Sequence, residues 1–174
     1  SVLKQVKRPR LVACDSMNLW IEIKRKALMK LLSKVDILML NDSEARELSA
    51  EPSLLKAAKF ILSHGPGTVI IKKGEHGALL FSSNEVFYAP ALPLEEVFDP
   101  TGAGDTFAGG FIGYLAATAD TDFENMKRAV IYGSAMASFC VEKFGTERLL
   151  NLTREEIEQR VQRFIDLSAV EISF

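Results

Sequence analysis

Two kinds of apolar pattern alternate along the chain. Short, almost wholly apolar runs are typical of strands buried in a parallel sheet, whereas apolar residues that recur every three or four positions are typical of amphipathic helices. The predicted strands cover residues 11–14, 35–40, 68–71, 78–81 and 86–89. This alternation predicts an α/β protein with a mainly parallel sheet, and the closely spaced last three strands predict an antiparallel part at one edge.

Each longer predicted helix is defined by one apolar stripe. The stripes are Trp20, Ile23, Ala27, Leu28, Leu31 and Leu32; Leu55, Ala58, Ile61 and Leu62; Phe107, Ala108, Phe111, Ile112 and Leu115; Met126, Val130, Ala137, Val141 and Phe144; and Ile157, Val161, Phe164 and Ile165. We expect Asp42 or Ser43 to cap a further short helix that ends near Ser49. Thr153 and Glu156 have the spacing of a capping box.

Composition and charge narrow the class of protein. The 174 residues are 48% hydrophobic and 25% charged, with a formal net charge of −2. This is the composition of an ordinary globular protein, and its near-neutral charge gives no reason to expect nucleic acid or an anionic membrane as a partner. Cys14 and Cys140 lie in apolar surroundings, as reduced core residues of a cytoplasmic protein do. The sequence shows no apolar run of membrane-spanning length and no signal peptide.

The most informative stretch runs from Phe98 to Asp105, between an extended run and a helical stripe. Gly102 and Gly104 stand at the predicted start of the helix, where the lack of a Cβ lets the backbone come close to a ligand. The N–H groups of the first turn and the positive end of the helix dipole then form an anion site. Asp105 falls in this turn, where a carboxylate either caps the helix or takes a proton from an attacking hydroxyl.

Two further polar elements follow predicted strands. Asn41 and Glu44 come directly after the second strand, and Asp15–Asn18 close the first. A carboxylate and an amide in such a place can hold Mg²⁺ through water, although Asn41–Glu44 is also a good helix start. Ligands of parallel sheets bind at the carboxyl ends of the strands. We therefore expect both elements and the Gly102–Asp105 turn to converge on one site.

The stretch from Phe98 to Asp105, continued by Thr106-Phe107-Ala108-Gly109-Gly110-Phe111, closely resembles the second signature of the ribokinase-like (PfkB) carbohydrate kinases. The resemblance implies a three-layer, doubly wound fold and phosphoryl transfer from ATP to a sugar-like hydroxyl. In this family the residues that match Gly102, Ala103 and Gly104 form the anion hole, and the residue that matches Asp105 is the catalytic base. The alternative is a glycine-rich strand-to-helix turn in an unrelated α/β protein.

The same resemblance implies further roles. Asn41 and Glu44 match a motif that steers Mg²⁺ and the nucleotide phosphates, and Asp99 matches a residue that helps to hold a monovalent cation such as K⁺. The candidate nucleotide contacts are Asn41, Lys72, Lys73, Gly74, Gly77, Thr101 and Ser134, with the loop that begins at Phe144. A glycine-containing hairpin with a charged tip explains residues 72–77 nearly as well. The small residues around Ser134 permit close approach of either another helix or a flat ligand.

The resemblance covers essentially all of residues 1–174 as one part of a kinase domain, and it matches only the C-terminal part of such a kinase. The family's N-terminal lid, its first signature and most of its sugar contacts have no counterpart here. We expect the catalytic half of a sugar kinase, with ATP and a sugar-like molecule as ligands, or else a non-catalytic nucleotide-binding or assembly fragment. A sheet truncated on its N-terminal side would expose the strand at 11–14 along one edge, and we expect association, as a homo-oligomer, through that edge.

Overall fold

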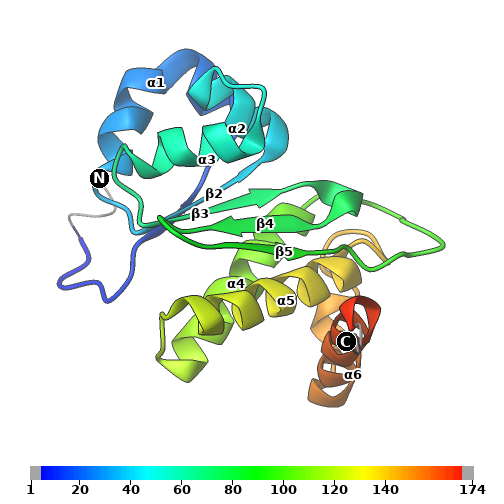
Figure 1. Cartoon of the computed structure of the whole chain (residues 1–174). Coiled ribbons are helices and arrows are strands. Elements are labelled where there is room, and N and C mark those ends of the chain that lie inside the picture. Colours follow the sequence, from blue (N-terminus) through cyan, green and yellow to red (C-terminus); the bar gives the residue numbers. More distant parts are fainter. Residues whose placement is uncertain (1–4, 170–174) are drawn as a thin grey trace, which may run out of the picture. The chain divides into compact units, whose positions relative to one another are not determined.

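A computed structural model of the chain describes residues 5–169 (Figure 1). Its strands are β1 (Ala13–Asp15), β2 (Ile37–Asn41), β3 (Thr68–Lys72), β4 (Ala78–Phe81) and β5 (Val86–Ala89), which stand in this order in one sheet. Its helices are α1 (Asn18–Leu32), α2 (Asp42–Ser49), α3 (Leu54–Leu62), α4 (Ala103–Thr118), α5 (Phe123–Cys140) and α6 (Arg154–Ser168), with short 3₁₀-helices η2 (Gly74–His76) and η3 (Leu149–Asn151). The predicted α/β class is confirmed.

The two ends of the sheet differ in strand direction. β1 pairs in parallel with β2, with Ala13 opposite Ile37 and Asp15 opposite Met39. β4 and β5 are neighbours joined only by residues 82–85, and a parallel pair would need a much longer crossover, so these two strands run antiparallel. β1 is the first strand in the order of the sheet, which confirms the prediction that the strand near residues 11–14 lies at an edge.

The chain divides into two compact units. The first comprises the residues up to Ile71 together with Phe81–Glu85, and the second comprises Lys72–Leu80 and the residues from Val86 onward. In the first unit, α2 contacts α1, α3 and β2. The core of this unit is made of fully buried aliphatic side chains, among them Leu38 and Leu40 of β2, Leu48 of α2 and Ile61 of α3.

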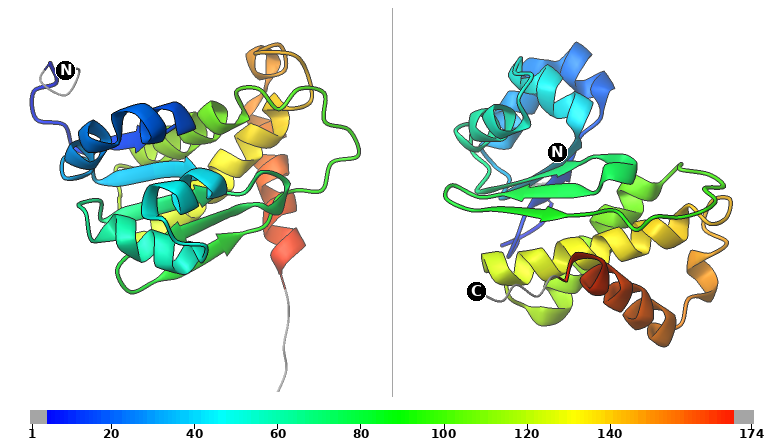
Figure 2. Two further views of the ribbon diagram at one scale, coloured as in Figure 1. Left: turned by 90° about the horizontal axis from the view of Figure 1, so that it is seen from above. Right: turned by 45° about the vertical axis from the view of Figure 1, so that its right-hand side comes forward.

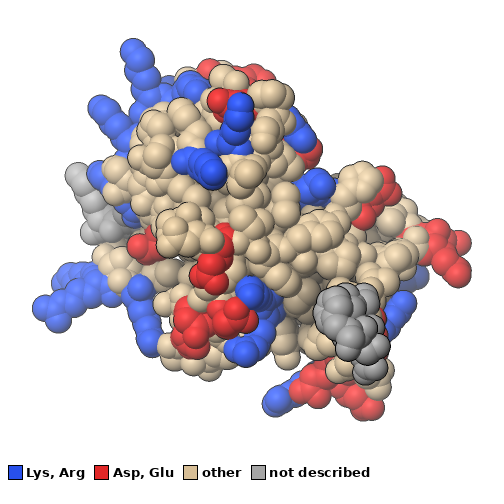
Figure 3. All heavy atoms as spheres, in the orientation of Figure 1, with Lys and Arg blue, Asp and Glu red and all other residues tan. Residues whose placement is uncertain are grey.

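Helix α1 departs from its predicted stripe. Trp20 and Ile23 are 46% and 58% exposed, whereas Ile21 and Leu28 are buried. The backbone of Lys24 leaves helical geometry, with φ −132° and ψ 25°. The buried residues Ile21, Leu28 and Leu32 are seven and four positions apart and so share one face of the helix, and Trp20 and Ile23 lie outside that face. The prediction that Trp20 and Ile23 point inward is therefore wrong. Basic side chains gather over the same helix (Figure 3).

Helices α4 and α5 pack along one another in the second unit (Figure 2). A Cβ at Gly133 would lie 2.8 Å from the carbonyl oxygen of Phe107, and one at Gly110 would lie 2.9 Å from Cγ of Met136. The missing side chains thus let the two backbones come close together. Of the two explanations for the small residues of α5, close approach of a helix is the one that the structure shows for Gly133. The α4 stripe is buried as predicted at Phe107, Phe111 and Leu115.

Helix α6 begins at the predicted capping box. Thr153 Oγ1 accepts a hydrogen bond from the N–H of Glu156 at 3.2 Å, and Glu156 Oε2 accepts one from the N–H of Thr153 at 2.9 Å. Two predicted inward positions here are wrong, as is Leu55 of α3, which is 48% exposed at the first turn of its helix. Ile165 is 50% exposed, and Phe144 is 59% exposed because α5 ends at Cys140, before Phe144 could join its stripe.

The two cysteines are free thiols, Cys140 buried and Cys14 partly buried. Burial, and then the neighbouring carboxylate of Asp15, raises the pKa of the Cys14 thiol, so this side chain stays protonated near neutral pH. Within residues 5–169, none of the helices combines the length and the apolar character that crossing a membrane requires.

Candidate functional site

The predicted anion site is the turn that leads into α4. Gly102 is the N-cap of the helix, with φ +80° and ψ 0°, a left-handed conformation that suits glycine. The N–H of Ala103 donates to the carbonyl oxygen of Pro100 at 3.2 Å. The N–H groups of Gly104 and Asp105 donate to no acceptor among the described residues. Two donors therefore point out of the positive end of a helix.

Lys72 lies against this turn. A Cβ at Gly104 would stand only 3.2 Å from Lys72 Nζ, so the ammonium occupies the space that a side chain at position 104 would need. Lys72 is the last residue of β3 and belongs to the same compact unit as α4. A positive charge beside open N–H groups strengthens the attraction of this helix end for an anion.

Asp105 lies on the exposed side of the first turn of α4. The described residues offer its carboxylate no hydrogen bond and no ion pair. The alternative that Asp105 serves only as the cap of α4 is not supported by this geometry, because the capping position belongs to Gly102. The carboxylate is left accessible to a ligand.

The segment before the turn is held in place by the end of α5. The N–H groups of Phe98 and Asp99 both donate to the carbonyl oxygen of Val141, at 2.8 and 3.4 Å, and Cys140 Sγ lies 3.7 Å from the carbonyl oxygen of Thr101. Asp99 Oδ1 accepts a hydrogen bond from the N–H of Thr101 at 2.9 Å. That bond, together with one from the Thr101 side chain, lowers the pKa of Asp99, so its carboxylate stays ionised.

Residues 73–77 form a tight turn around η2. The N–H of Lys73 donates to the carbonyl oxygen of Gly77 at 2.8 Å, and Gly74 and Gly77 both have positive φ. A Cβ at Gly77 would overlap the carbonyl oxygen of Ala89 in β5. Gly77 is therefore explained by close packing against a neighbouring strand, while Gly74 and the Lys73 side chain remain candidate nucleotide contacts.

Asn41 and Glu44 lie in the first unit, where they close the N-terminal end of α2. Asn41 Oδ1 accepts hydrogen bonds from the N–H of Glu44 at 2.8 Å and from Ser43 Oγ at 2.6 Å. Glu44, only 4% exposed, accepts from the N–H of Asn41 at 2.8 Å. The cap of this helix is therefore Asn41, and the prediction of Asp42 or Ser43 is wrong because the helix follows the strand directly and already includes both residues.

Two of the three polar elements follow paired strands of the first unit. β1 ends at Asp15 and β2 at Asn41, and the pairing of Asp15 with Met39 brings these ends side by side. The third element, Gly102–Asp105, belongs to the second unit. The convergence of all three on one site stays a prediction.

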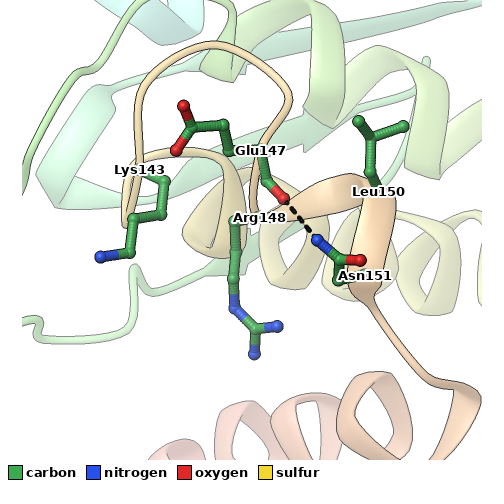
Figure 4. Close-up of a pocket in the computed structure, with 5 residues that line it drawn as sticks. All are labelled: Lys143, Glu147, Arg148, Leu150 and Asn151. Atoms are coloured by element: carbon green, nitrogen blue, oxygen red, sulfur yellow. Dashed lines mark hydrogen bonds between the residues drawn. The ribbon is translucent and has the colours of Figure 1, made fainter.

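The sequence did not single out a hollow beyond the end of α5. It has a volume of about 480 Å³ and is lined by Lys143, Glu147, Arg148, Leu150 and Asn151 (Figure 4). Asn151 Nδ2 donates to the carbonyl oxygen of Glu147 at 3.3 Å and closes the turn. Four of its five lining residues belong to the loop that begins at Phe144, which the resemblance makes a candidate nucleotide contact. Ser134 is partly exposed and lies in the middle of α5, nearly two helical turns before the end of that helix at Cys140.

A glycine turn with open N–H groups at the head of a helix is an arrangement that many α/β proteins use to bind phosphate groups. Comparison with known proteins identifies the family. Residues 4–153 match the pfkB family of carbohydrate kinases. The chain therefore belongs to the pfkB family, as its motif predicted.

Individual relatives agree with this assignment. The chain is 33% identical over 135 residues to a ribokinase of Staphylococcus aureus, covering 75% of this chain and 42% of that protein. It is 40% identical over 93 residues to a cytidine kinase of Thermococcus kodakarensis, covering 52% and 33% of the two chains. The chain thus spans less than half the length of each of these two relatives.

Solved structures show the same fold. A ribokinase from Thermotoga maritima superposes with a TM-score of 0.74 at 30% identity, over 92% of this chain and 52% of that chain. An E. coli protein assigned as a ribokinase II, in complex with ATP and Mg²⁺, superposes with a TM-score of 0.66 at 34% identity, over 80% and 43% of the two chains. The prediction of a ribokinase-like fold is confirmed, and this chain corresponds to about half of it.

Proposed function

We propose that this chain is the nucleotide-binding and catalytic part of a kinase that transfers a phosphoryl group from ATP to a hydroxyl group of a sugar or sugar-like compound. The observation that carries the proposal is the head of α4, where open N–H groups, the ammonium of Lys72 and the exposed carboxylate of Asp105 lie together. This combination provides a binding site for the transferred phosphoryl group and a proton acceptor within one helical turn.

In the proposed reaction, Asp105 accepts the proton of the acceptor hydroxyl as its oxygen attacks the γ-phosphorus of ATP. The bond between that phosphorus and the oxygen bridging to the β-phosphate breaks, and ADP leaves. The N–H groups of residues 102–104 are the predicted anion hole. In this structure Ala103 N–H is engaged by Pro100, and the N–H groups of Gly104 and Asp105 are the available donors. Lys72 adds positive charge where negative charge develops.

The remaining proposed nucleotide contacts are Lys73, Gly74, Thr101 and Ser134. Gly77 shapes the turn at Lys73.

Asn41 and Glu44 are proposed to hold Mg²⁺ through water. Their donor oxygens suit this ion, and because the capping box already occupies Asn41 Oδ1 and Glu44 Oε2, an indirect contact fits them better than direct ligation. When bound, Mg²⁺ would neutralise phosphate charge. Asp99, ionised as described, is the proposed side chain for a monovalent cation such as K⁺.

The complete protein would supply the acceptor site. We propose that the chain forms one part of a single kinase domain, that it works in the cytoplasm as its two free thiols suggest, and that the β1 edge is where further protein, including a second copy, attaches. The second candidate is a non-catalytic nucleotide-binding or assembly fragment, which would keep the open helix end of α4 and carry no acceptor site.

Calorimetry of this chain with Mg-ADP tests the nucleotide site, and turnover of ATP against a panel of sugars and nucleosides tests the reaction. We expect weak binding by the chain alone, and turnover only by the complete kinase. A folded sample that gives no heat at millimolar Mg-ADP would refute the nucleotide site. Binding without turnover by the complete protein would favour the non-catalytic alternative.

A further inference from the structure

The side chain of Glu142 joins three segments of the second unit. Its Oε1 accepts a hydrogen bond from Nη2 of Arg160 in α6 at 2.6 Å, and its Oε2 accepts one from Nε of Arg148 in the loop beyond α5 at 3.0 Å. Glu142 itself stands two residues past the end of α5. A carboxylate that meets two guanidinium groups has little freedom to move.

Both arginines are anchored in turn. Arg160 Nη1 donates to Ser138 Oγ at 2.8 Å, and its guanidinium lies 3.9 Å from the centroid of the Phe139 ring. Arg148 Nη2 donates to Glu156 Oε1 at 2.7 Å. Glu142 is only partly exposed; this burial raises its pKa, but the bonds from Arg160 and Arg148 outweigh burial and leave the pKa below its usual value. The carboxylate is therefore ionised and fixed at neutral pH.

The residue before Glu142 holds the segment that leads into the anion turn. The carbonyl oxygen of Val141 accepts from the N–H groups of Phe98 and Asp99, and only Thr101 and Pro100 separate this attachment from Gly102. The backbone of Val141 can serve as a fixed point only while its own position is fixed. The N–H groups of Val141 and Glu142 donate to the carbonyl oxygens of Ala137 at 3.4 Å and Phe139 at 3.1 Å, and the Glu142 carboxylate adds side-chain bonds to α6 and to the loop beyond α5.

We propose that Glu142 is a positioning residue: with Arg148 and Arg160 it fixes the Val141 carbonyl, and through that carbonyl it sets the place of the turn at the head of α4. This inference rests on the proposed function for its effect on nucleotide binding, but not for its effect on the 98–102 segment. Glu142 touches no ligand in this scheme.

The test compares Glu142→Gln with Glu158→Gln, a matched variant that removes a carboxylate paired with Arg154 on the outer side of α6. Amide hydrogen exchange reports directly on the N–H groups of Phe98 and Asp99. We expect exchange at these two amides to become faster in Glu142→Gln, and the affinity for Mg-ADP to fall about tenfold. Glu158→Gln should leave both quantities unchanged. Glu142→Asp keeps the charge and should recover part of the loss, and it replaces Glu142→Gln if that variant does not fold.

Two results would overturn the proposal. Exchange at Phe98 and Asp99 that stays as in the wild type would mean that the carboxylate does not restrain the segment. Faster exchange with unchanged Mg-ADP affinity would mean that the segment does not set the anion turn. Failure of the wild-type chain to bind Mg-ADP would instead remove the proposed function, and the exchange comparison would still decide whether Glu142 holds the segment.

Discussion

Helices α2 and α4 begin in opposite ways. At α2, the side chains of Asn41 and Glu44 and their backbone N–H groups satisfy one another in a capping box. At α4, the cap is a glycine without a side chain, and the N–H groups of Gly104 and Asp105 have no acceptor in the described part of the chain. Capping side chains also close α3, α5 and α6, from Ser53, Asp122 and Thr153.

The closed end of α2 contributes to the stability of the fold, whereas the open end of α4 is available to bind a ligand. A capping side chain contributes about 1 kcal/mol to a helix, and α4 forgoes that contribution. Helix α1 also lacks a side-chain cap, so an open end alone does not define a site. What distinguishes α4 is the Lys72 ammonium beside Gly104. An open helix end with a cation next to it is suited to an anion, whereas a closed end is suited to holding the fold together.

The largest expected effect is at Asp105. In the complete kinase, Asp105→Asn should lower the rate of phosphoryl transfer by roughly 10²–10⁴-fold and leave Mg-ADP affinity about the same, because a general base acts in the reaction rather than in binding. The measurements are steady-state kinetics and calorimetry. Asp122→Asn is the matched control, since asparagine caps a helix as well as aspartate does. Loss of binding together with the rate would instead make Asp105 a structural residue.

A smaller effect is expected at Lys72. Lys72→Met removes the cation beside the open helix end, and a hydrogen bond to a charged group is worth about 1.5–3 kcal/mol, so Mg-ADP affinity should fall about tenfold to a hundredfold. Calorimetry measures the change. Lys59→Met, on the exposed side of α3 in the first unit, should leave the affinity as it was. Equal affinities for the Lys72 variant and the wild type would show that the ammonium takes no part.

Gly104→Ala should lower the affinity for Mg-ADP without lowering the stability of the protein. Alanine favours a helix over glycine by up to about 1 kcal/mol, but the new Cβ would crowd Lys72 Nζ, so we expect unchanged or higher stability with Mg-ADP affinity reduced a few-fold. Thermal unfolding and calorimetry give the two quantities. Gly113→Ala in the same helix meets nothing within 4 Å and should raise stability alone. A Gly104→Ala variant that behaves like Gly113→Ala would contradict the crowding.

The smallest expected effect is a pH-dependent change in stability from Glu156, which belongs to the capping box of α6. The hydrogen bond from the Thr153 N–H, followed by those from Arg148 and the Thr153 side chain, lowers the pKa of Glu156 to about 2 in the folded protein. A lowered carboxyl pKa contributes stability above the unfolded value, and the contribution is lost as pH falls toward the folded value. The stability difference between wild type and Glu156→Gln should therefore shrink from pH 5 toward about pH 2. Urea unfolding at several pH values measures it, and a difference independent of pH would contradict the assignment.

The sequence predicted those features that are determined by interactions between residues close together along the chain. The strands Ala78–Phe81 and Val86–Ala89 and the capping box at Thr153 were predicted at their observed residues, because each is determined by neighbours along the chain. The exposure of Trp20 and Ile23 was missed because apolar residues of α1 stand on more than one face, and the periodic pattern does not say which face, here that of Ile21, Leu28 and Leu32, packs against the core.

The candidate site also has parts that the sequence predicted and parts that it did not. The glycine turn and Asp105 were visible as a motif, since the turn needs glycine at one position for conformational reasons and at another for space. The network of Glu142, Arg148 and Arg160 was not visible, because it joins residues up to eighteen apart whose charges look like ordinary surface positions. Long-range pairing of this kind becomes apparent only in three dimensions.

The close approach of α4 and α5 at Gly133 bears on how natural variants of this protein should be read. One added methyl group there would press on the Phe107 carbonyl, five residues past Gly102, and we expect it to displace the head of α4. Such a change would disturb the proposed anion site while leaving every residue that we propose to bind the nucleotide in place. A substitution at Gly133 therefore counts as a change to the proposed site, although Gly133 itself packs against Phe107.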